Sequence, residues 1–148
     1  MADTRVQLEV EDWVRREWMP QRFDQQFVRE RVRLSSGGVC DFDAVSADRK
    51  IVAAISTSGA LTASGKHAVG KMLKIRSDMY FLLLATADRR LVVLTERDMY
   101  ERCLKEAEGG RVPSSIEFLL AEIPGSLETK LRLSRGTASD EVSPRRGQ

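Results

Sequence analysis

Two aspartates, Asp41 and Asp43, have types and a spacing that could support chemistry. They alternate with Cys40, Phe42 and Ala44, so a strand in this segment places both carboxylates on one face. Carboxylate oxygens are ligands that Mg²⁺ or Mn²⁺ prefers, although two carboxylates on one strand form only a weak metal site. The same carboxylates also suit ion pairs with arginines of a neighbouring strand, each contributing roughly 0.2 to 1 kcal/mol. The sequence leaves both interpretations open.

Basic side chains form a second candidate set. Arginines occupy alternate positions between 29 and 33, which predicts a strand with one cationic face, and lysines recur over a predicted helix at 65–77. Such groups are either solvated and ion-paired or in contact with the phosphates of a nucleic acid. The candidates for a nucleic-acid contact are Arg29, Arg31, Arg33, Lys66, Lys71 and Lys74.

Composition and charge narrow the classes of protein and partner. The 148 residues are 42% hydrophobic, which is ordinary for one globular domain, and 24 basic against 22 acidic side chains give a net charge of +2. This excess lies entirely after residue 131, where the charged residues are Arg132, Arg135, Arg145, Arg146, Asp140 and Glu141. The body of the chain is therefore neutral, and a nucleic-acid partner would need local clustering of cations.

The cysteines and the apolar segments indicate a compartment. Cys40 and Cys103 form no C-x-x-C pair, and no secretory signal opens the chain, so we expect a reducing cytoplasm. The longest apolar run, residues 79–85, is much shorter than the roughly 20 residues of a membrane-spanning helix. No membrane partner is expected.

Hydrophobic periodicity predicts an α/β protein. The predicted helices cover residues 5–18, residues 65–77 and a segment with an apolar stripe at 99–107. The predicted strands cover residues 27–34, 39–45, 51–56, 79–86, 91–95 and 116–123. The order α-β-β-β-α-β-β-α-β predicts a single domain over 1–133 with a mixed sheet flanked by helices, whereas the polar residues 134–148 are expected to form a disordered tail.

The order of elements over residues 6–86 resembles that of the PD-(D/E)XK nuclease superfamily. The shared features are a helix, a three-stranded meander with Asp43 on its second strand, a crossover helix and a buried fourth strand. The resemblance implies a restriction-endonuclease-like fold with the candidate site beside Asp43.

The active-site motif of that superfamily is degenerate in this chain. In those nucleases the strand after the aspartate carries E-x-K or Q-x-K. Here residues 42–45 read F-D-A-V and residues 51–56 read I-V-A-A-I-S, so that Ala54 stands at the position of the second acid and Ser56 at that of the lysine. Alanine and serine can neither bind a divalent metal in that role nor stabilise charge at phosphorus.

Two functions follow from the resemblance. The favoured expectation is a catalytically silent nuclease-fold domain, without a cofactor, that binds nucleic acid weakly or serves as a protein-interaction module. The alternative is a Mg²⁺- or Mn²⁺-dependent nuclease with a rearranged site, in which Glu17 supplies a further acid to Asp43 and Lys66 replaces the missing lysine.

Self-association is a third expectation. Trp13 and Trp18 are five residues apart, or about 140° around an α-helix, so one helix face cannot bury both. The apolar strand at 116–123 has only Glu117 and Glu122 to protect its edge from pairing. A homodimer would cover both features.

Overall fold

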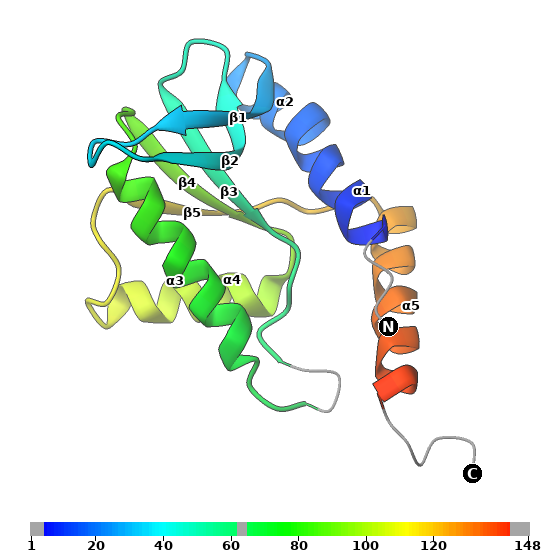
Figure 1. Ribbon diagram of the computed structural model, residues 1–148. Helices are drawn as coiled ribbons and strands as arrows, with labels where there is room; N and C mark the ends of the chain where they lie inside the picture. The colour runs from blue at the N-terminus through cyan, green and yellow to red at the C-terminus, as the bar shows by residue number, and fades with distance from the viewer. Residues whose placement is uncertain (1–4, 62–64, 143–148) are drawn as a thin grey trace.

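The computed structural model describes residues 5–61 and 65–142, with side chains described as far as Leu133 (Figure 1). The helical elements in chain order are α1 (Arg5–Trp13), the π-helical turn η1 (Val14–Trp18), α2 (Met19–Phe23), α3 (Val69–Leu84), α4 (Arg97–Glu108) and α5 (Gly125–Val142). The strands are β1 (Phe27–Arg33), β2 (Val39–Ser46), β3 (Ile51–Ser56), β4 (Arg89–Leu94) and β5 (Ile116–Leu120). No helix in the described ranges is long and apolar enough to cross a membrane.

In the part of the chain that the structure describes, the strands form a five-stranded mixed sheet in the order β1-β2-β3-β4-β5. Strands β1, β2 and β3 are antiparallel neighbours, and β3, β4 and β5 are parallel. Parallel neighbours need a crossover connection, which α3 supplies between β3 and β4 and α4 supplies between β4 and β5. The predicted α/β class with a mixed sheet flanked by helices is therefore confirmed.

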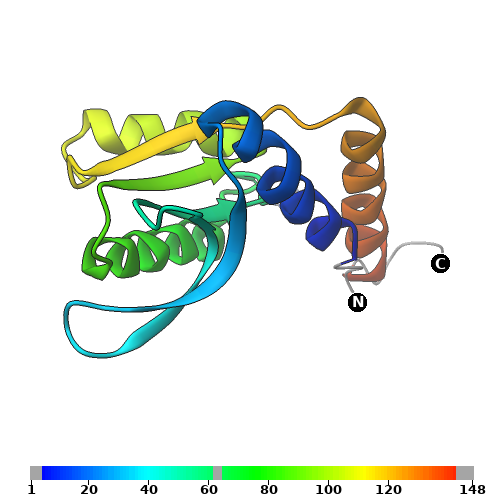
Figure 2. The same ribbon diagram turned by 90° about the horizontal axis from the view of Figure 1, so that it is seen from above.

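Helices cover both faces of the sheet. On one face, α3 and α4 bury apolar side chains against the strands, and Cys103 of α4 is fully buried among them. On the other face, η1 and α2 contribute Val14 and Met19 to a second core. Helix α5 lies beside α1, as both views show (Figures 1 and 2). Val10 packs there with Leu127 and other apolar groups.

The prediction of a central strand at 79–86 is wrong, because this segment continues and ends α3. The run is apolar without a clear period, and such a run fits a buried helix as well as a buried strand. Its buried members extend the helical series, which is Met72, Ile75, Met79 and Leu82, while Tyr80 and Leu83 are exposed. The fourth strand of the sheet is consequently β4, which starts at Arg89.

The C-terminal region also differs from expectation. The strand predicted at 116–123 ends at Leu120, and helix α5 follows, although the sequence analysis expects no helix there. Helix α5 continues to Val142, into the segment 134–148 for which the sequence predicts a disordered tail. Residues 143–148 lie outside the described residues.

The two tryptophans pack on the same side of the molecule. Trp13 and Trp18 both contact the core cluster that contains Val14 and Met19. The turn η1 between them is π-helical, so its hydrogen bonds join residues five apart and bring such residues close to one another around the axis. The 140° separation expected for an α-helix therefore does not apply, and the spacing of the two tryptophans no longer supports a homodimer.

Candidate functional site

A cleft opens where β3 ends, between α1 and the first half of α3. Its volume is about 720 Å³, and the residues that line it include Glu11, Arg29, Asp43, Ser56, Lys71, Lys74 and Asp78. A smaller cavity of about 130 Å³ has four of these residues in its wall and reaches Asp41, Ala54 and Phe81. The two cavities thus share walls formed by β1, β2 and α3.

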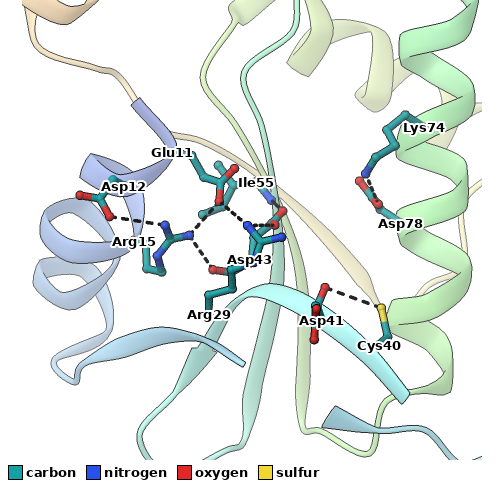
Figure 3. A network of polar contacts seen from close by, with 10 residues as sticks. All are labelled: Glu11, Asp12, Arg15, Arg29, Cys40, Asp41, Asp43, Ile55, Lys74 and Asp78. Atoms are coloured by element: carbon teal, nitrogen blue, oxygen red, sulfur yellow. Dashed lines mark hydrogen bonds and ion pairs between the residues drawn. The ribbon is translucent and has the colours of Figure 1, made fainter. Parts of the chain in front are cut away.

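The cleft forms because β2 and β3 separate beside Asp43. The two strands pair at Ala44 with Ala53 and at Val45 with Val52. At the next position, the Asp43 carboxylate accepts a hydrogen bond of 2.8 Å from the backbone N–H of Ile55 (Figure 3). A side-chain oxygen thereby satisfies a main-chain donor of β3, and the strands can diverge without leaving that donor unpaired.

Arg15 and Arg29 hold the α1 wall of the cleft. Arg15 donates one hydrogen bond of 2.9 Å to the backbone carbonyl of Asp43 and another of 2.9 Å to the Glu11 carboxylate. Arg29 Nη1 lies 3.5 Å from Glu11 Oε2 and 4.0 Å from Asp43 Oδ1. Glu11 is therefore held between two arginines, and α1 is tied to β1 and β2 (Figure 3).

The environment of Asp43 opposes its ionisation. Burial raises the pKa of the Asp43 carboxyl, and the negative charge of Asp78 raises it further. The Ile55 N–H and the positive charges of Arg29 and Lys74 act in the opposite direction, but the pKa stays above the ordinary value. The acid at the centre of the cleft is thus harder to ionise than a solvated aspartate.

The α3 wall carries a further ion pair. Lys74 Nζ lies 2.7 Å from Asp78 Oδ1, one helical turn away, and both side chains line the cleft. Lys71 lies one turn earlier and is exposed at the cleft. Three basic and three acidic side chains therefore face one another across this space, and its charge is nearly balanced.

Two positions discussed in the sequence analysis, Ala54 and Ser56, lie beside this site. Continuing the β2–β3 register by one residue sets Ala54 opposite Asp43. Ala54 is 6% exposed and lines the smaller cavity, while Ser56 lines the larger one. An acid at position 54 and a lysine at position 56, as the resemblance would imply, would therefore each line a cavity that Asp43 also lines.

The basic candidates divide into two groups. Arg29, Lys71 and Lys74 line the cleft, whereas Arg31, Arg33 and Lys66 are exposed and are not among its lining residues. Arg31 Nε lies 3.0 Å from Asp41 Oδ1 on the neighbouring strand. The interpretation of Asp41 as the partner of an arginine on the preceding strand is confirmed.

The structure corrects the prediction that Glu17 supplies an acid beside Asp43. Glu17 is exposed on η1 and does not line the cleft, so the structure does not bring it or Lys66 to Asp43. The acid from the first helical segment is instead Glu11. Its sequence signal is its place three residues before the buried Val14, which directs both side chains to the same side of the helix.

A metal site is not assembled from these acids. Asp41 and Asp43 both line the smaller cavity. Among the side chains that the structure describes, over residues 5–61 and 65–133, however, no group of three or more histidine, cysteine, aspartate or glutamate residues is arranged to hold a metal ion. The weak two-carboxylate metal site expected from the sequence gains no third ligand in this part of the chain.

Comparisons of the chain with models of protein families, with curated proteins and with solved structures found no match. The balanced charges of the cleft, its polar loop at 56–58 and its exposed lysines suit a ligand that carries both negative charge and hydrogen-bonding groups.

Proposed function

We propose that the chain is a catalytically silent relative of the PD-(D/E)XK nucleases, and that its cleft binds nucleic acid weakly through phosphate contacts. One observation carries the proposal. Asp43 lies in a cleft with Ala54 and Ser56 at the positions of the missing acid and lysine, and Lys71 and Lys74 line the same space.

The arrangement of elements supports the relationship to the nuclease fold. A helical segment, an antiparallel meander, the crossover helix α3 and a fourth strand follow one another, with Asp43 on the second strand. The fourth strand is β4 at 89–94 rather than the segment at 79–86, so the resemblance extends slightly further along the chain. The restriction-endonuclease-like fold is part of the proposal.

The contacts that the acidic side chains of the cleft already make favour a domain without catalytic activity. Asp43 accepts the Ile55 N–H, Glu11 contacts two arginines, and Asp78 contacts Lys74. A divalent cation needs several carboxylate oxygens directed at one point, and these oxygens already have other partners. The chain is accordingly expected to bind nucleic acid without cleaving it.

The same contacts explain why binding should be weak. A phosphate group that enters the cleft competes with Asp78 for Lys74 and with Glu11 for Arg29. Phosphate contacts release counterions, so the affinity is expected to fall strongly as the salt concentration rises. This binding would be insensitive to base sequence, because phosphates carry no sequence information.

Fluorescence anisotropy with labelled oligonucleotides at several salt concentrations tests the binding function. The variant Lys71→Ala/Lys74→Ala is expected to lower affinity about tenfold and to reduce the salt slope by about two, because each phosphate contact contributes about one. The matched control is Lys105→Ala/Lys130→Ala, which removes two exposed lysines from α4 and α5. Equal affinity of the two double variants would overturn the proposal.

A cleavage assay with plasmid and oligonucleotide substrates in Mg²⁺ or Mn²⁺ tests the loss of catalysis. No cleavage above the Asp43→Ala control is expected. Metal-dependent cleavage that Asp43→Ala abolishes would replace the silent domain with the alternative, a nuclease with a rearranged site. Glu11, Asp78 and Lys74 would then be the partners of Asp43 to test next, since they line its cleft.

A further inference from the structure

We infer that the cleft takes a single strand of nucleic acid, with a base stacked on Phe81 and the backbone phosphates following Lys74 and Lys71. The inference rests on the proposed function and specifies the ligand of that site. It draws on three features of the structure: the size of the cleft, the position of an aromatic pair, and the spacing of side chains along α3.

The size of the cleft favours a single strand. A volume of about 720 Å³ lies in the range of pockets that enclose a small ligand, roughly 300 to 1,000 Å³. It has room for a few linked nucleotides. A double helix, whose major groove alone is about 12 Å wide, can only touch the rim, where Lys71 is exposed.

An aromatic pair lies beside the cleft, where the smaller cavity adjoins it. Phe81 lines the smaller cavity together with Lys74 and Asp78, and 36% of the residue is exposed. The Tyr80 ring packs edge-on against it, with centroids 5.3 Å apart and an interplanar angle of 80°.

Burial in the core does not account for these rings. The side of α3 that packs on the sheet is formed by the series Met72, Ile75, Met79 and Leu82. Phe81 lies outside that series, and Tyr80 is 60% exposed. Proteins bind single strands by combining basic side chains that contact the phosphates with accessible aromatic rings, because every base has a face that can stack. Lys71 and Lys74 supply the basic groups here, beside the Phe81 ring.

The spacing of the cleft side chains along α3 matches the length of a short stretch of nucleic-acid backbone. Lys71, Lys74, Asp78 and Phe81 follow one another at intervals of three, four and three residues, which places them along one side of the helix. From Lys71 to Phe81 the helix rises about 15 Å, at 1.5 Å for each residue. That length corresponds to about four nucleotides at the 3.4 Å rise of a stacked strand.

Anisotropy with labelled oligo(dT) and oligo(rU) twelve nucleotides long, and with a blunt hairpin duplex, tests the inference. We expect at least tenfold tighter binding of the single strands, whether DNA or RNA. Unlabelled oligonucleotides of increasing length should compete more strongly until they are about four to five nucleotides long. At a rise of 3.4 Å for each nucleotide, this length spans the distance from Lys71 to Phe81.

Substitutions at Phe81 test the stacking directly. Phe81→Leu keeps an apolar side chain but removes the ring, and should weaken single-strand binding about fivefold or more, whereas Phe81→Trp should retain it. Leu83→Ala is the matched control, since Leu83 is similarly exposed at 40% and does not line either cavity. Thermal unfolding of each variant shows whether it is folded.

The outcomes separate this inference from the proposed function. Equal or tighter binding of the blunt duplex, with Lys71→Ala/Lys74→Ala still weakening it, overturns the single-strand inference and leaves phosphate binding in place. Unchanged single-strand affinity in folded Phe81→Leu overturns the stacking role. Failure to bind any of the three probes overturns both proposals.

Discussion

The Asp43 carboxylate accepts the backbone N–H of Ile55 at 2.8 Å, and the pairing of β2 with β3 stops at this point. The side chain takes the place of a main-chain acceptor and keeps the two strands apart where the cleft begins. Asp43 is thus a structural group of the cleft, whether or not it also contacts a ligand. Substitutions of Asp43 can distinguish the effect of its hydrogen bond on stability from the effect of its charge.

The first prediction concerns the hydrogen bond of Asp43. Asp43→Ala removes the acceptor of the Ile55 N–H and should lower the free energy of unfolding by about 1 kcal/mol, the usual contribution of one such bond. Asp43→Asn keeps an oxygen at that position and should be at least as stable as the wild type at pH 7. Urea denaturation measures both, and equal loss in the two variants would contradict the hydrogen-bond argument.

The second prediction concerns pH. Burial raises the folded-state pKa of Asp43 above the ordinary value of 3.8, so the folded chain favours the protonated carboxyl. This contribution to stability is complete below pH 3.8 and is lost as pH rises through the higher pKa of the folded state. The wild type should therefore lose stability relative to Asp43→Asn as pH rises above 3.8. A difference that is independent of pH would exclude this linkage.

The third prediction concerns the ion pair of α3. Asp78→Asn removes the carboxylate that contacts Lys74 and should strengthen nucleic-acid binding two- to fivefold, roughly what an exposed charge pair of up to 1 kcal/mol allows. The control is Glu117→Gln, which changes net charge equally but at the pair with Arg89 on the sheet. Anisotropy at low salt compares them. The same gain in both variants would indicate a net-charge effect instead.

The fourth prediction restores the motif. Ala54→Glu/Ser56→Lys sets a second carboxylate opposite Asp43, so the metal-free variant should lose roughly 1 to 3 kcal/mol through burial of an additional charged group. Added Mn²⁺ should raise its melting temperature, and EDTA should reverse the change, because a ligand that binds only the folded state stabilises it.

Two controls accompany the restored motif. Ala54→Gln/Ser56→Lys carries a side chain of similar size without the added charge and should respond less to Mn²⁺. The wild type should show little shift in melting temperature. A shift in the wild type as large as in the glutamate variant would contradict the interpretation of Ala54 as the missing ligand.

The fifth prediction tests the corrected element. In a helix, Leu82 is buried and Leu83 is 40% exposed, so Leu82→Ala should cost about 2 to 5 kcal/mol and Leu83→Ala much less. In a strand fully buried on both faces, the two substitutions would have similar effects. Urea denaturation of the two single variants distinguishes these cases.

The sequence predicts elements whose pattern is local and misses those that depend on distant partners. In β1 arginines recur at every second position, and in β2 Asp41 and Asp43 alternate with apolar residues, which is enough to locate both strands. The run at 79–86 has no such alternation, and only its packing on the sheet shows it to be helical. In α5, the apolar stripe is mainly Leu127 and Leu131, and its partner α1 lies at the other end of the chain.

The candidate site was predicted where it depended on neighbouring strands. Ala54 and Ser56 were located beside Asp43 because a strand register relates them directly. Glu11 was missed, because its approach to Asp43 depends on how α1 packs across the sheet and on its contact with Arg15. Lys74 was recognised as a cation, but its pairing with Asp78 within the cleft follows only from the extension of α3.

The two cysteines differ in accessibility, so the rates at which a thiol reagent labels them can measure local opening of the native chain. Cys40 is partly exposed near the smaller cavity, whereas Cys103 is fully buried under α4, and burial raises its thiol pKa to about 11. A thiol reagent can reach Cys103 only when α4 separates from the sheet, so its labelling rate reports the free energy of that separation. Because the reporter needs no substitution, labelling with and without an oligonucleotide would show whether a ligand held by α3 also restrains α4.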